Sequence, residues 1–275
     1  MTKPKIIFFG NGPLADYALG VLAEKCEIVF HARKKEDLEE VKKLTRDSSD
    51  KLYGILASYG VIIRPDILEL FEPEGILNIH PSLLPQYRGP SPIETAIVNG
   101  DKKFGVSVMK LAKAMDAGDI YHQATFSEKE IFSSDELSLI DASDYKDAVY
   151  QKLSEAGARW ITENLTHLPT AIPQDDSKAT FTKMLDKSLS PLNPAEKSAE
   201  QLLGEIRAFF GYPKSKYVFH DLECIIISAH IEDSAPSKNP LALQCHDGKY
   251  LVVDYLQPAG RKVMDAKSFL NGYCK

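Results

Sequence analysis

The first 80 residues alternate between short apolar runs and longer segments in which apolar residues recur at helical spacing. Such runs, bounded by turn-forming residues, predict buried strands at 5–9, 28–31, 53–59 and 75–79. The segments between them predict a helix that begins at Pro13 and further helices at 33–46 and 65–71. A chain that alternates strand and helix forms a parallel sheet with helices on both faces. We therefore expect an α/β fold with a doubly wound, Rossmann-like N-terminal domain.

The pattern changes after a further predicted helix at 143–168. Residues 169–194 contain four prolines and many polar residues, which is typical of a linker. A helix is predicted at 198–210, and short β-rich runs follow at 217–219, 224–228 and 250–253. Several short strands separated by turns indicate a small antiparallel barrel or sandwich. We predict a large domain over 1–172, a linker over 173–194 and a small domain over 195–275.

Charge and hydropathy exclude several classes of function. The chain has 33 Lys and Arg against 39 Asp and Glu, a net charge of −6, so any RNA contact needs a local basic patch. No apolar run approaches the roughly 18 residues that span a bilayer. Near the N-terminus only residues 6–9 are continuously apolar, which is too short for a secretory signal. We expect a cytoplasmic protein with no membrane partner.

The four cysteines give no sign of a metal site or a disulfide framework. They are widely spaced, and no two of them form a C-x-x-C pair. We expect free thiols and no metal at Cys26, Cys224, Cys245 and Cys274.

A glycine-rich motif follows the first predicted strand. Residues 10–15, GNGPLA, match the G-x-G-x-x-G/A pattern that lets a pyrophosphate approach a helix N-terminus. The acidic residue expected about 20 positions later is absent, and His31 with three basic residues stands there instead. We favour a tight strand-to-helix turn without a dinucleotide, and an NADP enzyme stays the alternative.

The stretch 75–120 carries the residues best suited to chemistry. Asn78 and His80 are two positions apart on a predicted strand, so their side chains share one face. Ligands of α/β sheets bind beyond the carboxyl ends of the strands, where these two side chains would project. Asp116 lies 36 residues after His80 and precedes an Ala-Gly turn that can bring it back toward the same place.

These three residue types suit attack on a carbonyl or formyl carbon. An asparagine amide can donate to a developing oxyanion, and a histidine can donate to the same oxygen or serve the leaving group. An aspartate can hold the imidazole and favour its protonated form. No Ser or Cys stands where a nucleophile elbow would place one, so the sequence does not indicate an acyl-enzyme.

Two long segments, NIHPSLLPQYRGPSP and AIVNGDKKFGVSVMKLAKAMDAGDI, resemble the signature of the folate-dependent formyltransferases. Three branches share it: enzymes acting on methionyl-tRNA, on glycinamide ribonucleotide and on sugar nucleotides. The segment ATFTKMLDKSLSPLNPAEKSAEQLLGEIRAFFGYPKSKYVF and residues 256–264, LQPAGRKVM, resemble the methionyl-tRNA branch. The resemblance therefore covers nearly the whole chain and implies a small C-terminal β-barrel of oligonucleotide-binding (OB) type.

The resemblance also implies roles for individual residues. Asn78, His80 and Asp116 match the catalytic triad of the family. The implied donor is 10-formyltetrahydrofolate, the implied acceptor is initiator methionyl-tRNA, and no metal is implied. We expect a monomer. The family's folate-binding loop corresponds to Ser82, Leu83, Leu84 and Pro85.

The tRNA-binding members of the family carry a long basic loop after the second strand, and this sequence is short at that place. Candidate phosphate contacts are Arg33, Lys34, Lys35, Lys214, Lys216, Arg261 and Lys262. The short loop leaves a sugar-nucleotide N-formyltransferase with the same donor and triad as an alternative. A non-catalytic RNA-binding protein on the same fold is a third hypothesis, which the intact triad disfavours.

Overall fold

A computed structural model describes residues 2–132, 142–237 and 241–273. The chain divides into two compact units. Unit 1 lies within residues 1–92, 103–131 and 149–183, and unit 2 lies within residues 93–102, 132–148 and 184–275. The domain boundaries predicted from the sequence stay a prediction.

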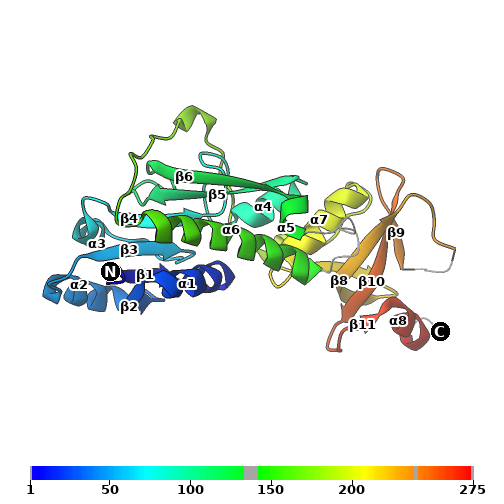
Figure 1. Ribbon diagram of the computed structural model, residues 1–275. Helices are drawn as coiled ribbons and strands as arrows, with labels where there is room; N and C mark the ends of the chain where they lie inside the picture. The colour runs from blue at the N-terminus through cyan, green and yellow to red at the C-terminus, as the bar shows by residue number, and fades with distance from the viewer. Residues whose placement is uncertain (1, 133–141, 238–240, 274–275) are drawn as a thin grey trace. The chain divides into compact units, whose positions relative to one another are not determined.

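Unit 1 contains a six-stranded sheet in the order β2-β1-β3-β4-β5-β6 (Figure 1). Strands β1 to β4 are parallel, as the alternation of strands and helices predicts. Strands β5 and β6 run antiparallel to their neighbours, which that alternation does not reveal because no helix separates them. The strands are β1 (Lys5–Gly10), β2 (Glu27–Ala32), β3 (Leu52–Ala57), β4 (Ile76–His80), β5 (Lys103–Lys110) and β6 (Ile120–Ser127).

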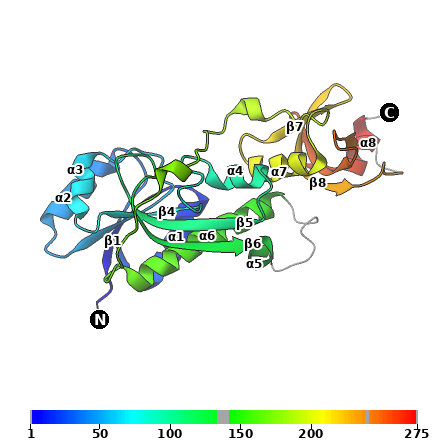
Figure 2. The same ribbon diagram turned by 90° about the horizontal axis from the view of Figure 1, so that it is seen from above.

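Helices cover both faces of this sheet. Their bounds are α1 (Pro13–Lys25), α2 (Asp37–Asp47), α3 (Pro65–Leu68), η1 (Glu69–Phe71) and α6 (Ala142–Asn164), of which residues 149–164 lie in unit 1. Helix α5 (Glu128–Phe132) follows β6 at the boundary of the unit, and α4 (Pro92–Val98) lies in unit 2 from its second residue on. On one face, Phe9 of β1 belongs to a buried cluster with residues of α2 and α3, which lie side by side in Figures 1 and 2. On the other face, Gly157 of α6 lies against Ile79 of β4. Ser154 of α6 also donates a hydrogen bond to the carbonyl of Leu14 in α1, so these two helices are neighbours.

The glycine-rich turn after β1 is explained by the backbone conformation and the close strand packing at this point. Gly12 caps α1 with φ of 78°, a conformation that favours glycine, and Pro13 is the first helical residue. A β-carbon on Gly10 would collide with the carbonyl oxygen of Ala57 on the neighbouring strand. The predicted strand-to-helix turn is therefore confirmed, and its glycines serve the backbone.

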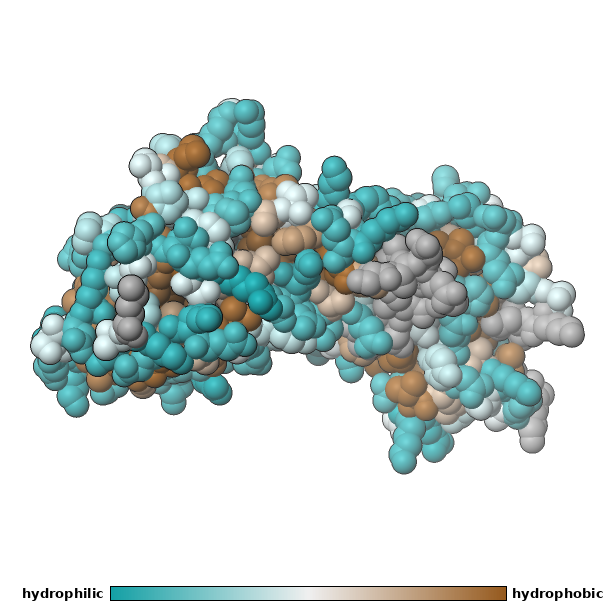
Figure 3. Space-filling view, viewed as in Figure 1, coloured by the Kyte–Doolittle hydropathy of each residue, from teal (hydrophilic) through white to brown (hydrophobic). Residues whose placement is uncertain are grey.

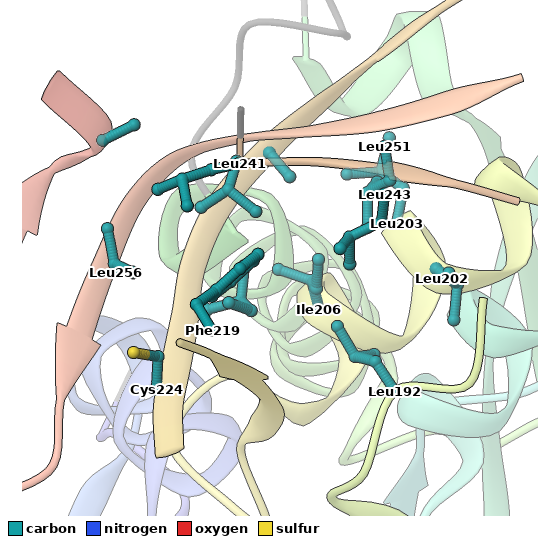
Figure 4. Close-up of a cluster of buried hydrophobic side chains, with 14 of the residues drawn as sticks. Leu192, Leu202, Leu203, Ile206, Phe219, Cys224, Leu241, Leu243, Leu251 and Leu256 are labelled. Carbon is teal, nitrogen blue, oxygen red and sulfur yellow. The ribbon is translucent and has the colours of Figure 1, made fainter. Parts of the chain in front are cut away.

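Unit 2 contains a curled antiparallel sheet in the order β11-β10-β8-β7, with β9 paired to β10. This agrees with the small antiparallel barrel predicted from the sequence. Its elements are α7 (Ala199–Phe209), β7 (Ser215–Phe219), β8 (Leu222–Glu232), β9 (Ala242–Gln244), β10 (Tyr250–Pro258), β11 (Met264–Asp265) and α8 (Ala266–Tyr273). Helix α7 begins at a capping box in which Ser198 and Gln201 bond each other's backbone N–H. Figure 4 shows Leu203 of this helix beside Leu243 and Leu251 of the sheet, and Ile206 beside Phe219.

The face of the molecule seen in Figure 3 is mostly hydrophilic, with hydrophobic residues in small separate areas. Among the described residues, no helix is both long enough and apolar enough to cross a membrane. The same residues contain no group of three His, Cys, Asp or Glu side chains that could hold a metal ion. Cys26, Cys224 and Cys245 are free and buried, and Cys274 lies outside the described residues.

Candidate active site

Strand β4 carries the two candidate residues nearest the centre of the sheet. Every residue of β4 is buried, and its alternation places Asn78 and His80 on the same face as Ile76. The exposed fractions of the two residues are 5% and 4%. His80 is the last residue of the strand, at the carboxyl edge where parallel sheets bind ligands.

The ring of His80 has a defined orientation. Its Nε2 lies 3.0 Å from the carbonyl oxygen of Tyr87, and a carbonyl can only accept, so Nε2 carries a hydrogen. In the neutral ring, Nδ1 then bears a lone pair, and it lies 3.7 Å from Oδ2 of Asp116. The structure thus brings the predicted histidine and aspartate together, at a separation longer than a hydrogen bond.

Burial decides the charge of this histidine. Removal from water lowers the pKa of His80, the Asp116 charge and the Tyr87 carbonyl raise it, and the Arg88 charge lowers it further. The net direction is a lowered pKa, so the ring is neutral at pH 7. The aspartate does favour the protonated form, as expected from the sequence, but its effect is smaller than that of burial.

Asp116 lies in the loop that joins β5 to β6. Its φ is 49°, in the left-handed region that Asp and Asn adopt more readily than most residues. Its Oδ2 accepts a hydrogen bond of 2.8 Å from the backbone N–H of Gly89. Two residues later, a β-carbon on Gly118 would collide with the carbonyl of Lys110, so the loop closes tightly back onto β5.

The side chain of Asn78 is left available. Within the part of the chain that the structure describes, its amide makes no hydrogen bond. The residue is 5% exposed, and its amide atoms are not among the fully buried polar atoms that lack a partner, so a ligand or water can reach them. Asn78 therefore fits a donor that waits for an oxyanion.

The predicted folate loop is held rigidly through its backbone. Ser107 of β5 donates to the carbonyl of Ser82 at 2.6 Å and accepts from the N–H of Leu84 at 3.0 Å. The hydroxyl of Ser82 donates to the carbonyl of Gln86 at 2.6 Å. Ser82 and Leu84 are buried, whereas Leu83 and Pro85 are half-buried. Of the four predicted residues, the latter two thus retain side-chain surface for a ligand.

Sequence reasoning missed two polar residues that support the site. Arg88 is buried, with an exposed fraction of 4%. Its Nε and Nη2 donate to Oε1 of Gln174 at 3.1 and 2.7 Å, and Nη2 also donates to Asp176 at 2.7 Å. Arg88 could have been found from the sequence, because it lies six residues after the predicted start of the folate loop. Gln174 lies in the predicted linker, where no motif marks it as part of the site.

The beginning of the predicted linker pairs with the loop after β4. The N–H of Arg88 donates to the carbonyl of Thr180 at 2.9 Å, and the N–H of Thr182 donates to the carbonyl of Arg88 at 2.7 Å. These bonds form a parallel bridge between Arg88 and Phe181. Residues 174–182 are therefore part of the scaffold of the site in unit 1.

The first group of predicted tRNA contacts lies in the turn between β2 and α2. The turn covers only residues 33–36, as the sequence indicates. The side chain of Asp37 accepts from the backbone N–H groups of Arg33 and Lys34 at 2.7 and 3.1 Å, which shapes the turn. Arg33, Lys34 and Lys35 are exposed.

The second group lies in unit 2. Lys216 of β7 and Gln257 of β10 both pair with Ile225 of β8, so Lys216 lies at the end of the sheet where β10 turns into β11. Arg261 and Lys262 are exposed residues of that turn. Lys214 precedes β7, and Lys216 donates to Glu223 at 2.8 Å, which offsets its charge.

Two family profiles match the chain. The profile described as "Formyl transferase" matches residues 18–165, and the profile described as "Formyl transferase, C-terminal domain" matches residues 193–274.

Curated relatives match over most of the chain. The methionyl-tRNA formyltransferase of Borrelia turicatae (strain 91E135) is 35% identical over 246 residues, covering 84% of this chain and 74% of that protein. The methionyl-tRNA formyltransferase of Halalkalibacterium halodurans is 32% identical over 268 residues, covering 92% of this chain and 79% of that protein.

Solved structures share the fold. The methionyl-tRNA formyltransferase from Clostridium thermocellum aligns with a TM-score of 0.63 at 19% identity, over 96% of this chain and all of that one. WlaRD, a sugar 3N-formyl transferase crystallised with dTDP and 5-N-formyl-THF, aligns with a TM-score of 0.64 at 18% identity, over 95% of this chain and all of that one. Both likenesses concern the fold alone.

Proposed function

Because this chain belongs to the formyl transferase family, we propose that it transfers the formyl group of 10-formyltetrahydrofolate to the α-amino group of initiator methionyl-tRNA. The observation that carries the chemistry is the buried group at the end of β4. There an unpartnered amide of Asn78 stands two residues from His80, whose Nδ1 faces Asp116. The acceptor is inferred from the relatives that match over most of the chain. We place the reaction in the cytoplasm, as part of translation initiation.

The first role of the site is to stabilise negative charge. When the acceptor amine attacks the formyl carbon, the formyl oxygen becomes an oxyanion. The Asn78 amide can donate to that oxygen without first breaking a protein hydrogen bond. Donors fixed in a water-poor site are worth about 2.7–4 kcal/mol each in the transition state.

The second role is to move one proton. The neutral His80 ring presents the Nδ1 lone pair, because Nε2 is committed to the Tyr87 carbonyl. Nδ1 can accept the proton that the attacking nitrogen loses and return it to the folate nitrogen that leaves. During that interval the ring is positively charged, and Asp116 at 3.7 Å stabilises the charge.

The proposed function also requires a surface that binds folate and a surface that binds tRNA. We propose that residues 82–85 contact the folate, with Leu83 and Pro85 supplying apolar side-chain surface. Basic residues of both units, at 33–35 and at the end of the unit 2 sheet, are proposed to meet tRNA phosphates. No step assigned to the described residues involves a metal.

A competition assay tests the acceptor. Wild-type protein and 10-formyltetrahydrofolate are offered charged initiator methionyl-tRNA together with nucleotide-linked amino sugars. We expect formyl methionine on the tRNA and no formylated sugar. Turnover on a sugar alone would overturn the proposed acceptor while keeping the donor and the site.

That second acceptor class deserves the competition because one observation favours it. The turn between β2 and α2 is confined to residues 33–36, where tRNA-binding relatives are expected to carry a long basic loop. A sugar nucleotide needs no such loop. The match of residues 193–274 to the C-terminal formyl transferase profile, together with the curated relatives, favours tRNA.

A further inference from the structure

We propose that Gln174 is a positioning residue: it holds the Asp116 loop so that the carboxylate faces His80, and buried Arg88 fixes Gln174 in turn. The inference rests on the proposed function, because it assigns a role within that same site. It concerns a residue from the segment after α6, far in sequence from the three candidate catalytic residues.

Both polar atoms of the Gln174 side-chain amide have hydrogen-bond partners, and these partners fix the orientation of the amide. Its Nε2 donates to the carbonyl of Asp116 at 2.8 Å and to the carbonyl of Gly118 at 2.7 Å. Its Oε1 accepts twice from Arg88. Carbonyls cannot donate and a guanidinium cannot accept, so the amide can be oriented in only one way. Gln174 thereby links the guanidinium of Arg88 to the backbone at both ends of the turn that contains Ala117 and Gly118.

The Asp116 loop needs such support. Asp116 adopts a left-handed backbone conformation, which costs free energy unless the surroundings hold it. The backbone carbonyls bound by Gln174 flank the residue whose carboxylate must stay beside the imidazole. Without the two N–H donors, those carbonyls lose their partners and the turn is free to shift. A displacement of about 1 Å at a catalytic group can cost on the order of 100-fold in rate.

Arg88 ties this support to the other side of the site. Its neighbour Tyr87 accepts from His80, and its other neighbour Gly89 donates to Asp116. Three consecutive residues thus contact the histidine, Gln174 and the aspartate. The buried side chain of Arg88 donates to the half-buried side chain of Gln174. Gln174 and Arg88 therefore set the distance between the two catalytic groups from both sides.

The test separates the two halves of the Gln174 amide. Gln174→Glu keeps oxygen acceptors for Arg88 but removes both N–H donors to the Asp116 loop. We expect kcat for methionyl-tRNA formylation to fall about 10–100-fold, with KM for donor and acceptor within about 2-fold. The matched control is Asp176→Asn, which alters the exposed outer partner of Arg88 and leaves Gln174 in place. We expect it to retain kcat within about 2-fold.

A second measurement excludes a simple loss of folded protein. In Gln174→Met, a retreat of Asp116 removes a charge that raises the pKa of His80, so that pKa falls below its wild-type value. Nitrogen-15 NMR of the imidazole follows the pKa in the folded molecules alone, with the His80 signal assigned by its absence in His80→Ala. A smaller folded fraction would leave the pKa unchanged.

The outcomes are distinct. An inactive wild-type protein with every acceptor would overturn the proposed function and not the geometry. An active wild type whose Gln174→Glu variant keeps kcat would overturn the positioning role. So would equal losses in Gln174→Glu and Asp176→Asn, or an unchanged His80 pKa in Gln174→Met.

Discussion

Two histidines, one in each unit, stand beside carboxylates and respond in opposite ways. His80 in unit 1 is buried, and its Nδ1 lies 3.7 Å from Asp116. His230 in unit 2 is on β8, with Nδ1 at 2.9 Å from Asp254 and Nε2 at 3.3 Å from Glu232. The pKa of the first is lowered, and the pKa of the second is raised.

The difference shows that a neighbouring acid does not by itself fix the charge of a histidine. Burial lowers the pKa of both rings. At His230 the side chain keeps 31% of its surface in water, and two hydrogen-bonded carboxylates outweigh burial. At His80 burial is complete enough to outweigh one carboxylate beyond hydrogen-bond distance. A catalytic base has to be neutral before the reaction, whereas a surface ion pair has no such requirement.

The strongest test of this contrast is to remove each ring. His80→Ala is expected to lower kcat about 10²–10⁴-fold, because the proton acceptor is lost, and to leave the affinity for tRNA unchanged. His230→Gln, the matched control, should keep kcat within about 2-fold. Single-turnover formylation and a filter-binding assay measure the two quantities. Unchanged turnover in His80→Ala would remove His80 from the mechanism.

A slightly smaller loss is expected at the oxyanion donor. Asn78→Ala removes the unpartnered amide and should lower kcat about 10²–10³-fold with little change in KM. The two kinetic constants separate transition-state stabilisation from substrate binding, since loss of an amide used for binding would raise KM and leave kcat unchanged. Steady-state kinetics with both substrates varied decides between them.

A few-fold effect on affinity is expected at the end of the unit 2 sheet. The double variant R261Q/K262Q should weaken tRNA binding and reduce the slope of log affinity against log salt concentration by about 1–2. Lys249→Gln is the control, because that lysine precedes the opposite end of β10 and Glu200 already offsets its charge. An identical salt slope in the wild type and the double variant would show that this turn does not meet phosphates.

The smallest effect concerns stability around His230. Its raised pKa means that the carboxylates stabilise the protonated ring in the folded state. This stabilisation is fully present below the ordinary pKa of 6.5 and is lost as pH rises through the raised pKa. Asp254→Asn should therefore lower the free energy of unfolding by about 1 kcal/mol or less at pH 5.5, and by less at pH 9. Urea unfolding at the two pH values checks the difference.

Lowering the pH has the opposite effect on stability at the buried ring of His80. The folded state resists protonation of His80, so its lowered pKa destabilises the fold as pH falls below 6.5. The NMR titration described above should place the pKa of His80 below that of His230 in one spectrum. The reverse order would show that burial does not dominate at the end of β4.

The sequence by itself determined the parallel part of the sheet, the strand with Asn78 and His80, the glycine turn after β1 and the family. Each of these depends on residues close together in the chain, where short motifs and the spacing of apolar residues indicate the local structure. Only the tertiary structure decided that β5 and β6 are antiparallel, that burial keeps His80 neutral, and that Gln174 and Arg88 brace Asp116. These features depend on contacts between residues up to 94 positions apart, such as Arg88 and Thr182, and on exclusion of water, which no local pattern encodes.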